Sequence, residues 1–203
     1  MNRKQWFSRL AHKWGEMRRP DMAARLERVI RAARLRAGQQ VLDVGTGTGV
    51  LVPLMLKMVG KQGRIVGLDF SRAMLARARA KGFPDNVTFI QRDIQKTRLP
   101  AESFDRVICN AAMPHFPDKQ AAINEMARLL RPGGLLVVSH PIGRRAVRRI
   151  HREMGHSMAK DLVPTPRRLE RLFCKAGLQT AAIIDDPDFY LAVAGKPAEG
   201  GDV

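Results

Sequence analysis

Three glycines at alternate positions, Gly45, Gly47 and Gly49, follow the apolar segment 41–44. Glycine leaves the backbone bare for a ligand to approach, and a helix that begins just after the turn directs free N–H groups toward that ligand. The spacing G-x-G-x-G differs from the dinucleotide fingerprint G-x-G-x-x-G, and the missing lysine after the third glycine excludes a P-loop. We predict a pocket for a small adenosine-containing cofactor. The alternative is a tight strand-to-helix turn that binds nothing.

Two acidic residues end the next two apolar segments. Asp69 closes the segment 65–69, and its carboxylate can accept hydrogen bonds from both hydroxyls of a ribose. Asp93 follows the segment 87–91, and it can accept a hydrogen bond from an adenine amino group. The simpler alternatives are a helix cap at Asp69, for the segment from Ser71, and a loop-capping role for Asp93.

Apolar segments and helical patterns alternate along the chain, and this alternation positions the residues above. The order of strand and helix up to residue 91 predicts a mostly parallel sheet with helices on both faces. Ligands bind such sheets outside the carboxyl ends of the strands. The Pro-Gly-Gly at 132–134 is predicted to end a helix and to start another strand. The residues expected on the ligand-binding rim are Gly45, Asp69, Asp93, Asn110 and His140.

In this order and spacing, the segments resemble the class I S-adenosylmethionine-dependent methyltransferases over roughly residues 35–195. The resemblance implies an α/β fold with a Rossmann-like, doubly wound, seven-stranded sheet. This sheet is mostly parallel with the last strand antiparallel, and N-terminal helices and a helical lid accompany it. Within the superfamily, the chain is most similar to the small-molecule branch that includes ubiquinone/menaquinone biosynthesis methyltransferases. That likeness rests on the segments 104–110 and 113–118 and on the Leu-Arg-Pro-Gly-Gly turn at 130–134.

The resemblance also implies S-adenosyl-L-methionine as the cofactor and assigns residues to it. Asp43 is expected to steady the glycine turn and to approach the cofactor amino group. Phe70 packs on the adenine face or, alternatively, is simply a core residue. Asn110 ends the fourth strand, where the methyl group sits in this family. The full set of predicted cofactor-binding residues is Asp43, Gly45, Thr46, Gly47, Gly49, Asp69, Phe70, Asp93, Ile94 and Asn110.

Two histidines are candidate catalytic residues. Methyl transfer is an in-line displacement at an activated carbon, so the protein mainly positions the nucleophile and shields the site. A phenol, an enol carbon or a thiol also needs a base to remove its proton. His115 follows the fourth strand and His140 ends the fifth, and an imidazole titrates near neutrality. The alternative is that each is a structural histidine of the pocket.

Two further patterns narrow the chemistry. His151 and His156 fall in the predicted lid without a carboxylate at a supporting spacing, and together with His140 they form no zinc pattern, so no metal site is predicted. The segment 110–113, Asn-Ala-Ala-Met, lacks the two prolines and the aromatic residue typical of methyltransferases that modify exocyclic amino groups. Methylation of nucleobase amino groups is therefore disfavoured.

The length of 203 residues and the hydrophobic content of 45% suit one domain with a sizeable core. No apolar run reaches the roughly 18 residues of a membrane span, and the basic N-terminus lacks the apolar stretch of a secretory signal. The chain contains 2 cysteines, too few for a disulfide framework, so we expect a cytoplasmic protein.

Three regions are predicted along the chain. An N-terminal helical cap covers 1–38, with a break near Pro20, and a methyltransferase domain covers 39–196. A flexible tail follows over 197–203. Within the domain, a lid insertion at about 141–164 is expected to hold a basic helix over the mouth of the pocket. Val147, Ile150 and Met154 form the apolar face of that helix.

The formal net charge is +17, and the excess of arginine and lysine concentrates in residues 1–40 and 141–180. A surface of this kind can bind a phosphate backbone, an anionic membrane surface or an acidic partner, or it is simply solvated. Aromatic residues make up 5% of the chain and do not interleave with the basic runs. Binding of single-stranded nucleic acid, which uses aromatic stacking, is therefore possible but disfavoured.

The leading hypothesis is an enzyme that transfers a methyl group to oxygen, carbon or sulfur of a small-molecule substrate. One alternative is an RNA-directed methyltransferase that uses the basic surface. Another is a non-catalytic cofactor-binding protein that docks an acidic partner. An NAD-dependent dehydrogenase is disfavoured by the glycine spacing and by Asp93. The identity of the acceptor and the oligomeric state stay open.

Overall fold

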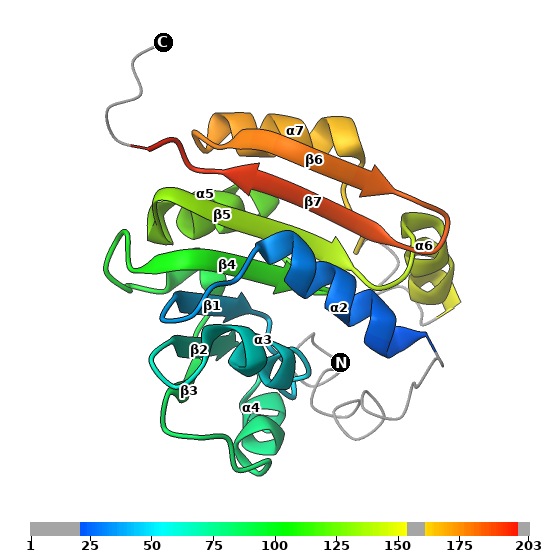
Figure 1. Cartoon of the computed structure of the whole chain (residues 1–203). Coiled ribbons are helices and arrows are strands. Elements are labelled where there is room, and N and C mark those ends of the chain that lie inside the picture. Colours follow the sequence, from blue (N-terminus) through cyan, green and yellow to red (C-terminus); the bar gives the residue numbers. More distant parts are fainter. Residues whose placement is uncertain (1–20, 154–160, 199–203) are drawn as a thin grey trace.

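The computed structural model describes residues 21–153 and 161–198. Within these ranges, seven strands form one sheet in the order β3-β2-β1-β4-β5-β7-β6 (Figure 1). β1 to β5 run parallel, whereas β7 is antiparallel to both β5 and β6. The predicted doubly wound sheet is therefore confirmed. The strands are β1 (Gln40–Val44), β2 (Arg64–Asp69), β3 (Val87–Gln91), β4 (Phe104–Asn110), β5 (Leu130–His140), β6 (Gln179–Asp185) and β7 (Tyr190–Gly195).

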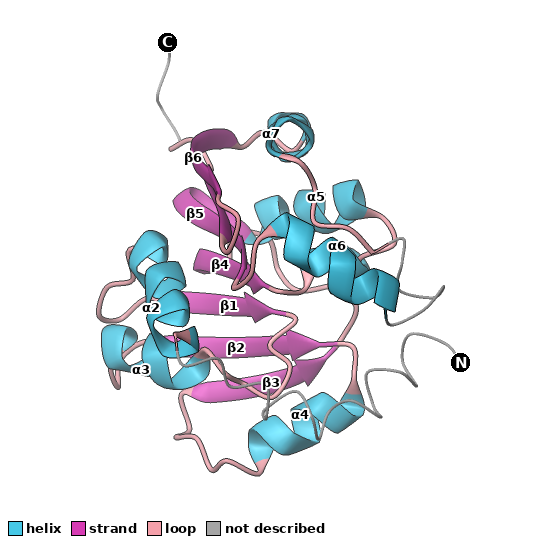
Figure 2. Cartoon of the chain, turned by 90° about the vertical axis from the view of Figure 1, so that its right-hand side faces the viewer, coloured by secondary structure: helices cyan, strands magenta, loops and turns pink. Residues whose placement is uncertain are grey.

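Helices cover both faces of the sheet, with α2 and α3 on one side and α5 on the other (Figure 2). Val41 belongs to the apolar cluster that includes residues of α2 and α3, whereas its neighbour Leu42 belongs to the cluster that includes residues of α5 and α7. Successive strand side chains point to opposite faces, so a strand buried on both sides has an uninterrupted apolar sequence. The helices are α2 (Met22–Ala33), α3 (Val52–Val59), α4 (Arg72–Arg79), α5 (Lys119–Leu129), α6 (Arg144–Glu153) and α7 (Pro166–Lys175), with the short 3-10 helices η1 (Ile94–Lys96) and η2 (Met113–His115).

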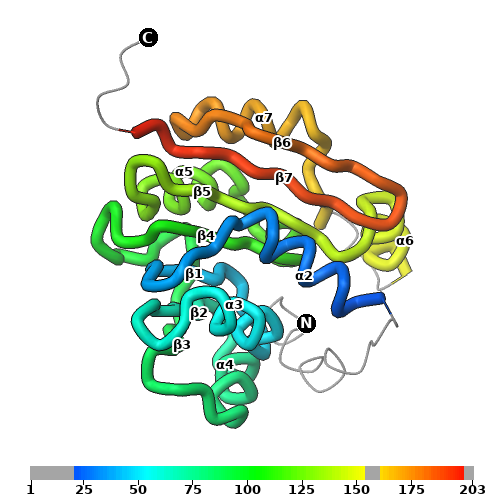
Figure 3. Tube along the Cα trace, in the orientation of Figure 1, coloured from blue at the N-terminus to red at the C-terminus, as the bar shows by residue number. Residues whose placement is uncertain are grey.

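The helix α2 lies across β4, β5 and β7, as the tube in Figure 3 shows. A buried arginine of this helix, Arg25, fixes its position. The guanidinium donates to the carboxylates of Asp21 (2.7 Å) and Asp188 (2.8 Å) and to the carbonyl of Pro141 (3.0 Å). These bonds join α2 to the loop after β5 and to the turn between β6 and β7.

Two local features differ from the prediction. The Pro-Gly-Gly turn lies inside β5 rather than before it, because Gly133 donates to the carbonyl of Lys196 (2.9 Å) and Gly134 accepts from its N–H (2.9 Å). In α6, Val147 is buried as predicted, but His151 takes the other buried position and Ile150 is only half-buried. Met154, His156, the first predicted N-terminal helix and the end of the tail lie outside the described residues.

The strand order reverses between β1 and β4, whose carboxyl ends lie side by side at the centre of the sheet. The helices after these two strands pack on opposite faces, which leaves a crevice at this edge, where open α/β sheets bind ligands. Among the described residues, no helix has both the length and the apolar character needed to cross a bilayer.

Candidate functional site

A cavity of about 350 Å³ opens at the carboxyl ends of the parallel strands. Its walls come from the residues that follow β1, β2, β3 and β4, so segments far apart in the sequence meet there. The lining residues are Val44, Gly45, Gly47, Leu68, Asp69, Phe70, Met74, Arg92, Asp93, Ile94, Gln95, Asn110, Ala111, Ala112, His115, Phe116 and Pro117. Seven of the ten predicted cofactor-binding residues and one of the two predicted catalytic residues therefore line one cavity.

The glycine turn after β1 approaches the loop after β4 very closely. Gly45 has φ +70°, and a Cβ atom built on it would lie 2.3 Å from the Cβ of Ala112. Both the backbone conformation and the available space therefore require glycine. The N–H groups of Gly45 and Thr46 donate to the carbonyl of Leu68 at 2.8 and 3.0 Å, which fixes the turn against β2.

Asp69 joins the first two turns of the site. Its carboxylate accepts hydrogen bonds from the N–H of Gly47 (2.9 Å) and the N–H of Ser71 (2.8 Å). The side chain that caps α4 is Ser71, so Asp69 is not the helix cap that the alternative interpretation required. Burial raises the pKa of Asp69, and the backbone hydrogen bonds oppose that rise by stabilising the carboxylate.

Three of the predicted cofactor-binding residues, Asp43, Thr46 and Gly49, are buried and do not line the cavity. The buried carboxylate of Asp43 accepts a hydrogen bond from the hydroxyl of Thr46 at 2.7 Å. Burial raises the pKa of Asp43 to about 7, and the nearby charge of Asp69 adds to the rise. A Cβ on Gly49 would meet the ring of Phe83 at 3.3 Å, so this glycine serves packing of the turn.

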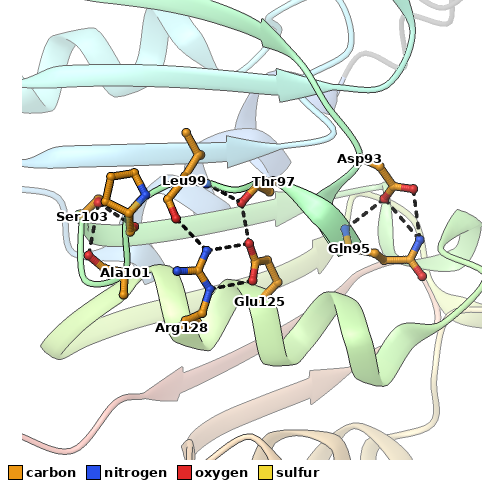
Figure 4. A network of polar contacts seen from close by, with 9 residues as sticks. Asp93, Gln95, Thr97, Leu99, Ala101, Ser103, Glu125 and Arg128 are labelled. Carbon is orange, nitrogen blue, oxygen red and sulfur yellow. Dashed lines mark hydrogen bonds and ion pairs between the residues drawn. The ribbon is translucent and has the colours of Figure 1, made fainter.

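The far end of the cavity has a mixed polar and apolar wall. Ile94 is buried, and Phe70 is 36% exposed. The carboxylate of Asp93 accepts from the N–H of Gln95 (2.9 Å) and from its side-chain amide (3.2 Å), as Figure 4 shows. Asp93 therefore has the loop-capping role of the alternative interpretation, while it also lines the cavity. Its contact with an adenine amino group stays a prediction.

The loop after β4 is strained where it borders the cavity. Ala111 has φ +57°, a conformation that costs a non-glycine residue about 1–2 kcal/mol. The N–H of Ala111 donates to the carbonyl of Ser139 (2.8 Å), and the hydroxyl of Ser139 donates to the side chain of Asn110 (3.0 Å). The end of β5 thus holds the loop in this conformation. Strained residues of this kind are typical of binding and catalytic sites.

His115 lines the cavity and is only 8% exposed. Its Nδ1 lies 2.9 Å from Oδ2 of Asp161, a buried carboxylate. The ring of His151 lies 5.2 Å from that of His115, and Nδ1 of His151 bonds to the backbone carbonyl of Asp161. The sequence spacing pointed to no carboxylate partner for His151 or His156. The carboxylate of Asp161 lies against His115 instead, whereas His151 contacts the backbone carbonyl of Asp161.

His140 is predicted as a second catalytic residue, and its environment limits what it can do. Nδ1 of His140 accepts a hydrogen bond from the N–H of Ile142 (3.3 Å), so the neutral ring carries its proton on Nε2. Burial lowers the pKa of His140 to about 3, and the nearby His115 and His151 add to the lowering. With Nδ1 occupied by this hydrogen bond and the pKa this low, His140 does not act as a base at neutral pH.

Sequence reasoning missed Asp161 because it lies 46 residues from His115 and belongs to a segment without a recognised motif. Asp161 is one of three acidic residues among ten arginines and lysines in residues 141–180, so its type alone did not distinguish it. Among the described residues, no group of three or more histidine, cysteine, aspartate or glutamate side chains is arranged to hold a metal ion.

Comparisons with known proteins agree with this geometry. A family model described as a methyltransferase domain matches residues 35–177. A ubiquinone/menaquinone biosynthesis C-methyltransferase of Coxiella burnetii is 35% identical over 113 residues, which cover 54% of this chain and 45% of that protein. The corresponding protein of Hahella chejuensis is 38% identical over 108 residues, covering 51% and 43%. The matched part thus spans less than half of these relatives.

Solved structures share the fold over nearly the whole chain. A chain in the complex of the Haloferax volcanii Trm112 methyltransferase activator with a methyltransferase gives a TM-score of 0.79 at 21% identity, covering 94% of this chain and 97% of that one. A SAM-dependent methyltransferase from Aquifex aeolicus gives 0.74 at 21% identity, covering 92% and 98%.

The contact between the glycine turn and Ala112 can be tested by substitution. We expect Gly45→Ala to lower the free energy of unfolding by about 3 kcal/mol, from the positive φ and the steric overlap together. Gly38→Ala is the matched control, because Gly38 has φ +79° but no atom within 4 Å of its Cβ position; we expect a loss of about 1 kcal/mol. Urea denaturation measures both variants.

The double variant Gly45→Ala/Ala112→Gly isolates the steric part, with Ala112→Gly alone as its baseline. The double variant should regain the steric part of the loss and keep the φ penalty. Equal losses for Gly45→Ala and Gly38→Ala would contradict the close approach.

The raised pKa of Asp43 predicts a specific pH dependence of stability. The folded state holds the Asp43 proton up to about pH 7, whereas the unfolded chain releases it near pH 3.8. This group therefore stabilises the fold most below pH 3.8, and the stabilisation is lost as the pH rises to about 7. We expect the unfolding free energy of the wild type minus that of Asp43→Asn to fall as the pH rises from 4 to 7 and to stay constant above. A difference that is flat over this range would show that Asp43 is ionised in the folded protein.

Proposed function

The chain belongs to the methyltransferase domain family, and from this premise we propose that it transfers a methyl group from S-adenosyl-L-methionine to a small-molecule acceptor. One observation carries the proposal: a single cavity is bordered by the buried carboxylate of Asp69 and by the imidazole of His115. The first is suited to a ribose, and the second is suited to an acceptor that must lose a proton.

The residues present fit the cofactor. A carboxylate has about four sites for donors, so Asp69 can accept from ribose hydroxyls beyond its bonds to Gly47 and Ser71. The glycine turn offers backbone without side chains, as close approach of a ligand requires. Phe70 and Ile94 supply an apolar wall for a purine, beside Asp93. Asn110, Ala111 and Ala112 line the same cavity as His115.

Bound S-adenosylmethionine supplies a methyl group already activated on a sulfonium sulfur, so the work of the protein is positioning and proton removal. The strained loop from Ala111 to His115 holds the base close to the end of β4. His115 removes the proton of the acceptor as the methyl group is transferred to that acceptor. His140 is neutral with its proton on Nε2, which leaves His115 as the base of the site.

We infer that the acceptor is a small ring compound with an ionisable hydroxyl, methylated at carbon or oxygen, or a thiol methylated at sulfur. The relatives named above are C-methyltransferases of ubiquinone and menaquinone biosynthesis. Removing the proton of a ring hydroxyl makes both its oxygen and the neighbouring ring carbon more nucleophilic, so a base would serve either acceptor atom. The apolar part of the cavity wall, with Met74, Phe116 and Pro117, suits such a ring.

A second candidate, methylation of RNA, is favoured by one observation. Arg145, Arg148, Arg149 and Arg152 are exposed on α6 at the spacing i, i+3, i+4, i+7, so they form one basic face. His151 of the same helix contacts His115, which places this basic face close to the cavity. We refer to these four residues as the α6 arginine face. The same arginines would also attract an anionic membrane surface or an acidic protein.

A transfer assay with a labelled methyl group separates the candidates. Full-length protein and labelled S-adenosylmethionine are offered quinols, phenols and thiols in parallel with RNA and protein pools. We expect label in an organic-soluble acceptor, lowered about 10²-fold by His115→Gln because the base is lost. Replacing the α6 arginine face by glutamine should leave this transfer unchanged.

The charge-matched control replaces Arg167, Arg168, Arg171 and Lys175, which are exposed on α7. Label in RNA that disappears with the α6 arginine face, but not with the control, and that falls steeply with salt would establish the second candidate instead. Cofactor binding without transfer to any pool would indicate a non-catalytic, partner-docking role.

A further inference from the structure

We propose that Asp161 is a positioning residue for His115 and fixes which nitrogen of the imidazole is basic. This inference rests on the proposed function, in which His115 takes a proton from the acceptor. It starts from the 2.9 Å distance between Nδ1 of His115 and Oδ2 of Asp161. An ionised carboxylate only accepts hydrogen bonds, so Nδ1 must carry the hydrogen and Nε2 keeps the lone pair.

Burial makes this pair strong. The side chains of His115 and Asp161 are 7% and 2% exposed, so solvent competes little for either partner. A buried carboxylate is costly unless it is hydrogen-bonded, and the imidazole N–H meets that need. When His115 takes a proton at Nε2, the carboxylate also stabilises the resulting imidazolium. The arrangement has the logic of a base that a third group orients.

The fold holds Asp161 in place through α6. Nδ1 of His151 donates to the backbone carbonyl of Asp161, because a carbonyl can only accept. At the start of α6, Arg144 donates to both carboxylate oxygens of Asp185 in β6, at 2.7–2.9 Å. Val147 packs into the apolar cluster that contains α5. The carboxylate is thus carried by the region predicted to be a lid, whereas its partner belongs to the loop after β4.

The two histidines that the structure describes beside His115, His140 and His151, do not replace Asp161. His140 and His151 are close enough to influence one another and His115 electrostatically. His140 already has its proton on Nε2, and His151 uses Nδ1 for the carbonyl of Asp161. Among the described residues, Asp161 is the carboxylate that bonds to His115. The expected acceptors are therefore those with a proton to lose, such as a hydroxyl or a thiol.

Nitrogen NMR of full-length protein with labelled histidine tests the proposal without any substrate. We expect wild-type His115 to be protonated at Nδ1 and unprotonated at Nε2 when neutral. Asp161→Asn should abolish this preference, because an amide can donate as well as accept, and Asp161→Glu should keep part of it. A wild-type His115 with its hydrogen on Nε2 would overturn the proposal. This measurement is made on the wild type, so it does not depend on whether a variant folds.

Asp185→Asn is the control for an indirect effect through α6. It makes the same carboxylate-to-amide change at the anchor of α6 and does not touch His115, so we expect the Nδ1–H tautomer to persist. If Asp185→Asn alters the tautomer as much as Asp161→Asn does, Asp161 acts only through the placement of α6, and the proposal fails.

Kinetics give a second, independent test once an acceptor is found. Asp161→Asn should lower kcat about 10²-fold and leave the affinity for the cofactor unchanged. The acid limb of the pH profile of kcat should move to lower pH, because the carboxylate no longer stabilises the imidazolium of His115. In a His115→Gln background the same change should have no further effect, because both residues serve one step. A further additive loss would contradict the proposal. Absence of cofactor binding would refute the proposed function alone, because the tautomer is measured without cofactor.

Discussion

The carboxylate of Asp69 is the interaction on which the site depends. Asp69 is the last residue of β2, and its carboxylate accepts hydrogen bonds from the backbone N–H of Gly47, in the turn after β1, and of Ser71, at the start of α4. Charge-assisted bonds of this kind are stronger than those between neutral groups, and here they join two turns that the sheet alone would leave independent. The bare glycine backbone and the acidic group therefore reach a ligand as one rigid unit. The near contact of Gly45 with Ala112 extends this unit to the loop after β4.

The second half of the site is arranged by proton placement. Backbone and carboxylate partners assign the hydrogens on the rings of His115, His140 and His151, and each assignment follows from what the partner can accept or donate. Burial keeps His140 neutral, and the carboxylate of Asp161 faces His115. The first half of the cavity thus suits binding and the second suits removal of a proton. The strained Ala111 lies between them, at the carboxyl end of β4.

The parts of the site that could be predicted are those encoded locally. The glycine turn and Asp69 each follow directly on an apolar strand, so their type and spacing in the sequence indicated their place in the site. The alternation of strands and helices predicted the sheet. Asp161 could not be predicted, because its contact with His115 depends on how two distant loops pack. The tautomer of His140 depends on a single backbone N–H, which no pattern reports. In α6 the apolar pattern correctly identified Val147, but a buried polar contact gave the other inward position to His151.

The most direct test is calorimetric titration of the wild type and of Asp69→Ala with S-adenosylmethionine, S-adenosylhomocysteine and NAD. Binding of both sulfur compounds but not of NAD, weakened about tenfold or more by Asp69→Ala, is the expected result, since one charge-assisted hydrogen bond contributes about 1.5–3 kcal/mol. Binding of NAD alone, or equal affinity of the two proteins for S-adenosylmethionine, would contradict the assignment of the cavity.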